Sequence, residues 1–161
     1  MIFNIIIVII SIILENIFNL YLNEFKLLSP LFTLMSLIFI YPYFKNSKRD
    51  YFLISLIVGF IYDIFFTNFY FLNPILFLLS SIIIFYIFSH KKYNIITIII
   101  VATIIIFIYN IGIYLILSFF SYIKYNIFEF SWIIKNFLIG NIIYVCILFI
   151  ISNKVYFKNK I

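Results

Sequence analysis

The chain is poor in the residues that build most catalytic and metal sites. Its 161 residues include one cysteine, one histidine, three glycines and three prolines. Cys146 alone can form neither an internal disulfide nor a cysteine-based metal site. His90, beside Lys91 and Lys92 at the end of an apolar segment, is expected to face a membrane interface. The sequence has no HExxH, GxSxG or phosphate-binding glycine loop, so we expect no enzymatic activity, metal or cofactor.

Charge is equally scarce. Only 10% of the residues are charged, against roughly 25% in typical soluble domains, while 67% are hydrophobic and the mean hydropathy is +1.27. A spanning helix needs about 20 mostly apolar residues, and the chain offers such segments in succession. The sequence therefore predicts an all-α integral membrane protein, with residues 1–161 forming one transmembrane domain in the lipid bilayer. The aromatic content fits membrane interfaces better than base stacking, so no nucleic acid partner is expected.

Hydropathy, with breaks at proline and at charge, divides the chain into a bundle of about six transmembrane helices. The second of these is short because it lies between Pro30 and Pro42. The predicted helices are 2–22, 31–44, 51–67, 71–89, 94–118 and 131–151.

The basic residues favour one side of this bundle. Eight of the 11 Lys and Arg residues follow the even-numbered segments: Lys45, Lys48, Arg49, Lys91, Lys92, Lys154, Lys158 and Lys160. By the positive-inside rule both termini are cytoplasmic, which an even number of spans permits. Five of them could also meet cytoplasmic partners or anionic lipid, and both interpretations stay open: Lys45, Lys48, Arg49, Lys91 and Lys92.

The third segment carries an aspartate among large apolar residues, in the stretch GFIYDIFFTN. Ser55, Gly59, Asp63 and Thr67 are four residues apart and so lie along one face of a helix. Small residues at this spacing let a second helix approach closely in membranes. We therefore expect Asp63 to point into a helix interface, away from lipid.

The first segment repeats the pattern with Ser11, Glu15, Asn19 and Asn23. A carboxylate within the bilayer is costly unless it is paired, neutral or in water. Lys135, the basic residue inside the sixth predicted span, lies at a similar depth and is our candidate partner for one or both acids. Hydrogen bonds to nearby Tyr, Ser or Asn side chains are the alternative.

The last two segments also carry polar stripes, which we interpret as helix-packing faces. These are Asn110, Tyr114 and Ser118 on the fifth, and Asn136, Gly140 and Tyr144 on the sixth, with Asn141 also facing the bundle.

The stretch VGFIYDIFFTNFYFLNPILFLLSSIIIFYI, residues 58–87, resembles the rod shape-determining protein MreD family of bacterial inner-membrane proteins. Gly59, Asp63 and Tyr86 match that family's motif by position. Pro30, Glu15 and Asn141 agree with other features of the family, as do length and span number. The chain departs from the family at Leu72-Asn73, followed by Pro74, where a Leu-Gly pair is usual.

The resemblance implies a multi-pass, non-enzymatic scaffold in the bacterial cytoplasmic membrane. It would support cell shape and peptidoglycan synthesis as part of the elongasome. The implied partners are an MreC-like bitopic protein, an MreB-type filament and peptidoglycan synthases of the penicillin-binding and RodA types. Glu15, Pro30, Ser55, Gly59, Asp63, Lys135 and Asn141 would then shape the bundle or its partner interface.

Two other functions compete with this one. The family is thought to share a fold with the substrate-binding S-components of energy-coupling vitamin transporters, so a transporter subunit is the alternative. That function needs a roomy cavity lined by polar groups. A proton path or an intramembrane acid and base pair built on Glu15 and Asp63 is the third hypothesis.

Overall fold

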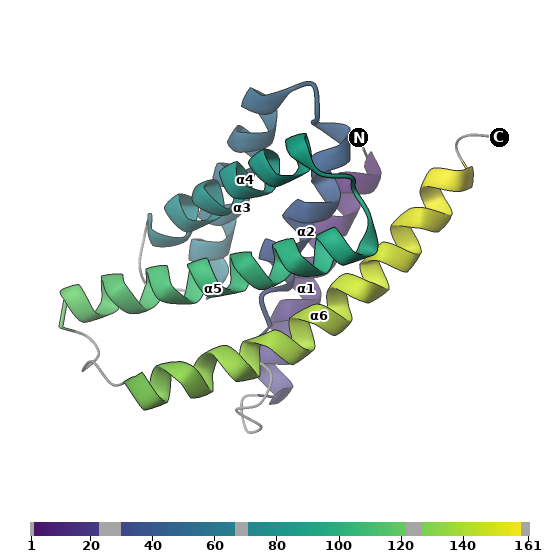
Figure 1. Cartoon of the computed structure of the whole chain (residues 1–161). Helices are drawn as coiled ribbons and strands as arrows, with labels where there is room; N and C mark the ends of the chain where they lie inside the picture. Colours follow the sequence, from purple (N-terminus) through teal and green to yellow (C-terminus); the bar gives the residue numbers. More distant parts are fainter. Residues whose placement is uncertain (1, 23–29, 67–70, 122–126, 159–161) are drawn as a thin grey trace.

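The computed structural model describes the backbone of residues 2–22, 30–66, 71–121 and 127–158 (Figure 1). Side chains are described for 5–20, 30–66, 71–121 and 138–153. This part of the chain is helical and contains no strand, so the predicted all-α class is confirmed. Its elements are α1 (Ile2–Leu22), α2 (Phe32–Ile40), the 3-10 helix η2 (Tyr41–Tyr43), α3 (Lys48–Phe66), α4 (Leu72–His90), α5 (Ile95–Phe119) and α6 (Ile127–Lys158).

Helix α2 is the centre of the fold. Every residue from Phe32 to Ile40 is buried, and α2 contacts each of the other five α-helices. At 1.5 Å per residue its nine residues extend over only about 14 Å, roughly half of a bilayer's hydrocarbon core. An amphipathic helix would show one polar face, whereas α2 is enclosed on all sides.

Proline explains where α2 ends, short of the predicted 31–44. Pro42 has no backbone N–H, so it cannot continue the α-helical ladder, and the chain turns into η2 instead. The carbonyl of Ile38, four residues before Pro42, accepts a hydrogen bond of 3.4 Å from the hydroxyl of Tyr93. A side chain from the α4–α5 loop thus replaces the missing backbone donor.

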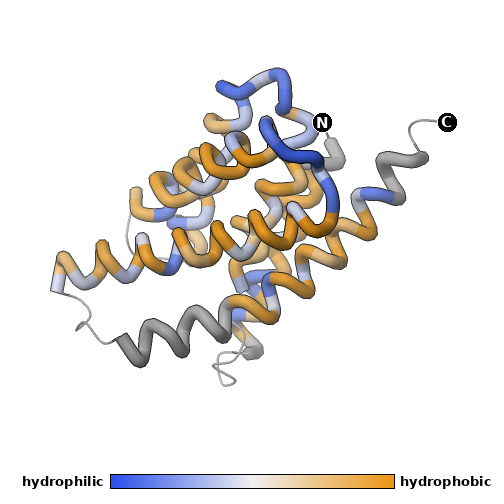
Figure 2. Tube along the Cα trace, in the orientation of Figure 1, coloured by the Kyte–Doolittle hydropathy of each residue, from blue (hydrophilic) through white to orange (hydrophobic). Residues whose placement is uncertain are grey.

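The outer helices present apolar side chains outward. On α1 these are Ile5, Ile6, Ile9, Ile10, Ile13 and Ile17, all exposed. By length and composition, α4 and α5 are apolar enough to cross a membrane. Figure 2 shows hydrophobic residues along the helices and hydrophilic ones gathered at the α2–α3 link and the α4–α5 loop. These two polar segments lie at the same end of the bundle.

Candidate functional site

The carboxylate of Glu15 is fully buried between α1, α2 and α3. Its Oε2 accepts a hydrogen bond of 2.8 Å from the backbone N–H of Thr33, and its Oε1 accepts one of 2.6 Å from the hydroxyl of Tyr62. These are the kind of bonds that the alternative to a lysine partner predicts. The side chain of Lys135 lies outside the described residues.

A second side chain, that of Asn141, caps the start of α2. The first N–H groups of a helix lack partners within it, and a hydrophobic residue at the N-cap offers none. Leu31 occupies that position, and its N–H donates to Oδ1 of Asn141 on α6, 2.8 Å away. Glu15 binds the N–H of Thr33 two positions on. The N-terminus of α2 is therefore capped by α1 and α6, and the positive end of its dipole faces a carboxyl group.

Replacing Asn141 by alanine should lower the free energy of unfolding by about 1–2 kcal/mol, the usual effect of losing a helix cap. Ser11→Ala is the comparison variant. Ser11 is also buried on the α1–α6 side, and its substitution leaves the α2 cap in place. Unfolding in mixed micelles, followed by circular dichroism, measures both. Equal stability of wild type and Asn141→Ala would contradict the capping role.

Asp63 anchors the other half of the polar core. Its Oδ1 accepts a bond of 2.6 Å from Nδ2 of Asn73 at the start of α4. Oδ1 of Asn73 in turn accepts a bond of 2.6 Å from the hydroxyl of Tyr109 on α5. The hydroxyls of Tyr109 and Tyr62 are neighbours. Glu15, Tyr62, Tyr109, Asn73 and Asp63 therefore form one buried polar network that joins α1 to α5.

Helices α3 and α4 approach each other closely at Gly59. A Cβ built on Gly59 would lie 2.6 Å from Cα and 2.8 Å from N of Pro74, so only glycine fits against that backbone. One turn earlier, the hydroxyl of Ser55 donates to that of Ser81 on α4 at 2.9 Å. The predicted stripe of Ser55, Gly59 and Asp63 thus lies along α4.

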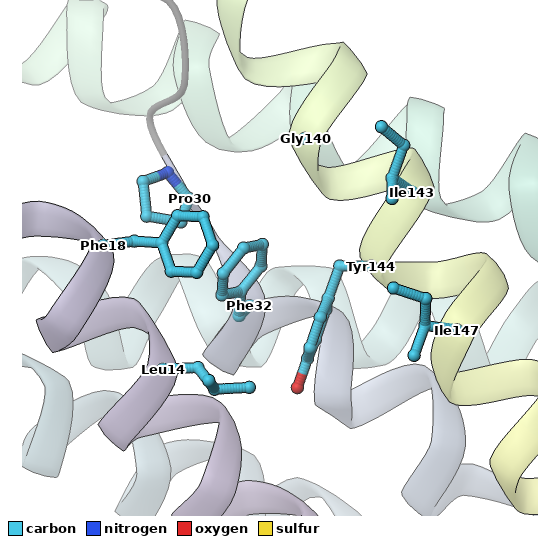
Figure 3. Close-up of a pocket in the computed structure, with 8 residues that line it drawn as sticks. All are labelled: Leu14, Phe18, Pro30, Phe32, Gly140, Ile143, Tyr144 and Ile147. Atoms are coloured by element: carbon cyan, nitrogen blue, oxygen red, sulfur yellow. The ribbon is translucent and has the colours of Figure 1, made fainter. Parts of the chain in front are cut away.

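Between α1 and α6 the surface opens into an apolar groove of about 320 Å³ (Figure 3). Phe32, at the start of α2, stacks on Tyr144 with ring centroids 4.2 Å apart. The Tyr144 hydroxyl is hydrogen-bonded to that of Ser11 at 2.6 Å and so is already satisfied within the protein. The lining residues are Leu14, Phe18, Pro30, Phe32, Gly140, Ile143, Tyr144 and Ile147.

The structure thus brings together two groups of the predicted residues. Glu15, Pro30 and Asn141 meet at the start of α2, and Ser55, Gly59 and Asp63 lie on the α3–α4 contact. Lys45, Lys48, Arg49, Lys91 and Lys92 are exposed, on the α2–α3 link, the start of α3 and the α4–α5 loop. Asn23, Thr67 and the side chain of Asn136 lie outside the described residues.

Three members of the network, Tyr62, Asn73 and Tyr109, were not among the predicted site residues. Tyrosine is frequent in this chain, with 14 copies, so its presence in a helix carries little signal. The sequence singles out Asn73 only as a departure from a family pattern and does not predict it as a partner of Asp63. In the sequence each of the three directly precedes a residue that was singled out: Asp63, Pro74 and Asn110. This adjacency is a signal that could have indicated them.

The hydrogen bonds of this network hold neighbouring helices together. Both oxygens of the Glu15 carboxyl are engaged by fixed donors, and Asn73 bridges Asp63 to Tyr109. Within the described part of the chain, no group of three His, Cys, Asp or Glu residues could hold a metal ion. These hydrogen bonds tie α1 to α2 and α3, α3 to α4, and α4 to α5.

Comparison with protein-family models, with curated proteins and with solved structures finds no match for this chain.

Proposed function

We propose that the chain is a non-enzymatic scaffold of the bacterial cytoplasmic membrane that docks the transmembrane helix of a bitopic partner. In this proposal α1 and α3 to α6 cross the bilayer, and α2 with η2 forms the inner half of a sixth segment. The start of α1 and the end of α6 lie toward the same end as the polar links (Figure 1), which supports a cytoplasmic position for both termini.

The observation that carries the proposal is the groove between α1 and α6. Its lining is apolar, so it favours an apolar occupant. Gly140 in the α6 wall permits close approach of another helix backbone. Ile143 and Ile147, on the same wall, are 57% and 49% exposed, so their side chains are available to a partner. A single transmembrane helix meets all three conditions.

The resemblance to the MreD family supplies the biological setting. It supports a place in the elongasome, where an MreC-like bitopic protein would supply the helix. An MreB-type filament and peptidoglycan synthases of the penicillin-binding and RodA types would be the further partners. The use of the buried polar network for internal contacts agrees with a scaffold, since its groups hold helices together.

The transporter alternative has less support. A vitamin-binding subunit needs polar groups aimed into its cavity to fix the ligand. The groove is lined by aliphatic and aromatic side chains, and the one hydroxyl among its lining residues, that of Tyr144, already bonds to Ser11.

The test is to fill the groove. Gly140→Trp should reduce recovery of the MreC-like protein with the tagged chain at least about tenfold, because the indole occupies the space that the partner's side chains need. Ile82→Trp is the matched control, since Ile82 is an exposed residue of α4 outside the groove. Quantitative mass spectrometry after mild solubilisation measures both.

The outcomes separate the hypotheses. Undiminished recovery with Gly140→Trp would place docking elsewhere and reject the groove. Recovery of an energy-coupling ATPase pair with the wild-type chain would favour the transporter subunit instead.

A further inference from the structure

A second cavity, of about 450 Å³, lies at the polar end of the bundle. It is bounded by η2, the end of α4, the α4–α5 loop and Asn153 on α6. Three lysines from two separate links converge on it: Lys45 follows η2, and Lys91 and Lys92 follow α4. All three side chains are exposed, so the cavity is open to ligands from outside.

The charge of this cavity is of one sign. Among the described residues that line it there is no Asp or Glu. Asp50, in the first turn of α3, is not among the lining residues. Three ammonium groups around one hollow attract an anion more strongly than three scattered over a surface.

A neutral donor stands beside the lysines. Asn153 on α6 adds a side-chain amide, whose NH2 group can donate. His90 adds no such donor as a neutral ring: its Nδ1 lies 2.9 Å from the carbonyl oxygen of Tyr86, which can only accept, so Nδ1 carries the proton and Nε2 is an acceptor. Ammonium and amide groups together form a donor set suited to phosphate oxygens.

Another part of the cavity wall is aromatic. Phe88 packs against Tyr93 and Tyr41, with ring centroids 5.0 and 5.3 Å apart. Tyr41 is 3% exposed, and its hydroxyl has no hydrogen-bond partner among the described residues. A ligand that fits both parts of the wall must join an anionic group to an apolar body.

We propose that this cavity binds the phosphate headgroup of an anionic phospholipid from the leaflet at that end of the bundle. Basic pockets between transmembrane helices on the cytoplasmic side are known to recognise such headgroups. The lysines would hold the phosphate while the aromatic wall packs against the glycerol and the first acyl carbons. The inference rests on the membrane location in the proposed function, but not on the scaffold role.

The experiment titrates phosphatidylglycerol and phosphatidylcholine onto detergent-solubilised full-length protein and counts bound lipids by native mass spectrometry. We expect one tightly retained phosphatidylglycerol per chain. Lys91→Gln with Lys92→Gln should weaken its retention about tenfold or more, because each lysine near the phosphate contributes to the attraction.

The matched control is Lys48→Gln with Arg49→Gln. It removes two positive charges from the same end of the bundle but outside the cavity, where Nζ of Lys48 lies 5.6 Å from the ring centroids of Phe52 and Phe85. We expect this control to change retention less than about twofold. Equal losses in both variants would overturn the site, because the charges would then act as a diffuse surface.

Two further arms define the ligand. Excess soluble glycerol phosphate should fail to displace the lipid; displacement would mean that the cavity selects free phosphate esters, which overturns the lipid assignment. The protein could retain the two lipids equally while it still fractionates with membranes and still recovers its bitopic partner. That result would defeat this inference alone. Absence of the protein from the membrane fraction would instead defeat the proposed function.

Discussion

Replacing Glu15 by alanine should lower the free energy of unfolding by roughly 2–6 kcal/mol. The substitution leaves two buried donors, the N–H of Thr33 and the hydroxyl of Tyr62, without their acceptor, and each such group costs about 1–3 kcal/mol. It also empties the space of the side chain at the start of α2. Unfolding of purified protein in mixed micelles, followed by circular dichroism, gives the difference.

Two further variants test whether the loss of stability in Glu15→Ala comes from the lost hydrogen bonds. Asn16→Ala changes the adjacent, exposed position and should leave stability within about 0.5 kcal/mol of wild type. Glu15→Gln keeps one carbonyl oxygen, so it should satisfy one donor and fall between wild type and Glu15→Ala. If all three variants were as stable as wild type, Glu15 would have no part in holding α2.

Gly59→Ala is expected to destabilise the protein by about 3 kcal/mol. The new methyl would lie 2.6 Å from Cα of Pro74, and helix α4 would have to move away because a backbone atom cannot rotate aside. Forcing an extra carbon into a close-packed contact costs typically about 1–3 kcal/mol or more. The shift would also strain the bond between Asp63 and Asn73, which lies one turn along the same contact.

Gly112→Ala is the matched control because it makes the same chemical change in another helix. There the added Cβ meets Cδ2 of Leu76, the far end of a flexible side chain that can change rotamer. Alanine also raises helix propensity by about 1 kcal/mol over glycine. Thermal unfolding in detergent should therefore show a large loss for Gly59→Ala and a small change for Gly112→Ala; equal effects would contradict the close α3–α4 approach.

Hydropathy located the helices well because each apolar segment is bounded by polar links or proline. The predicted 2–22 coincides with α1, and 94–118 lies within one residue of α5 at each end. The prediction 131–151 was too short, since α6 runs from Ile127 to Lys158. Hydropathy marks the apolar part of a helix, and no proline or glycine stops this one at its polar end.

The burial of Glu15 and Asp63 could also be predicted, because helical spacing shows which residues share a face. Their partners could not, since a hydrogen bond between segments depends on how two helices are rotated and shifted. Thr33 binds Glu15 through its backbone N–H, so its side-chain type carries no information about that contact. For the basic residues, the sequence indicated a common end but not the cavity that gathers Lys45, Lys91 and Lys92.

The capping of α2 by Asn141 has a consequence for the order in which the chain assembles. Asn141 follows Leu31 by 110 residues, so a growing chain contains the second helix long before it contains the group that completes it. A nine-residue helix is marginal alone, and Glu15, which accepts from the N–H of Thr33, is already present when α2 is made. The acceptor for the N–H of Leu31 arrives only after synthesis has passed residue 141. Chains cut short before that point would therefore hold α2 by one of its two caps.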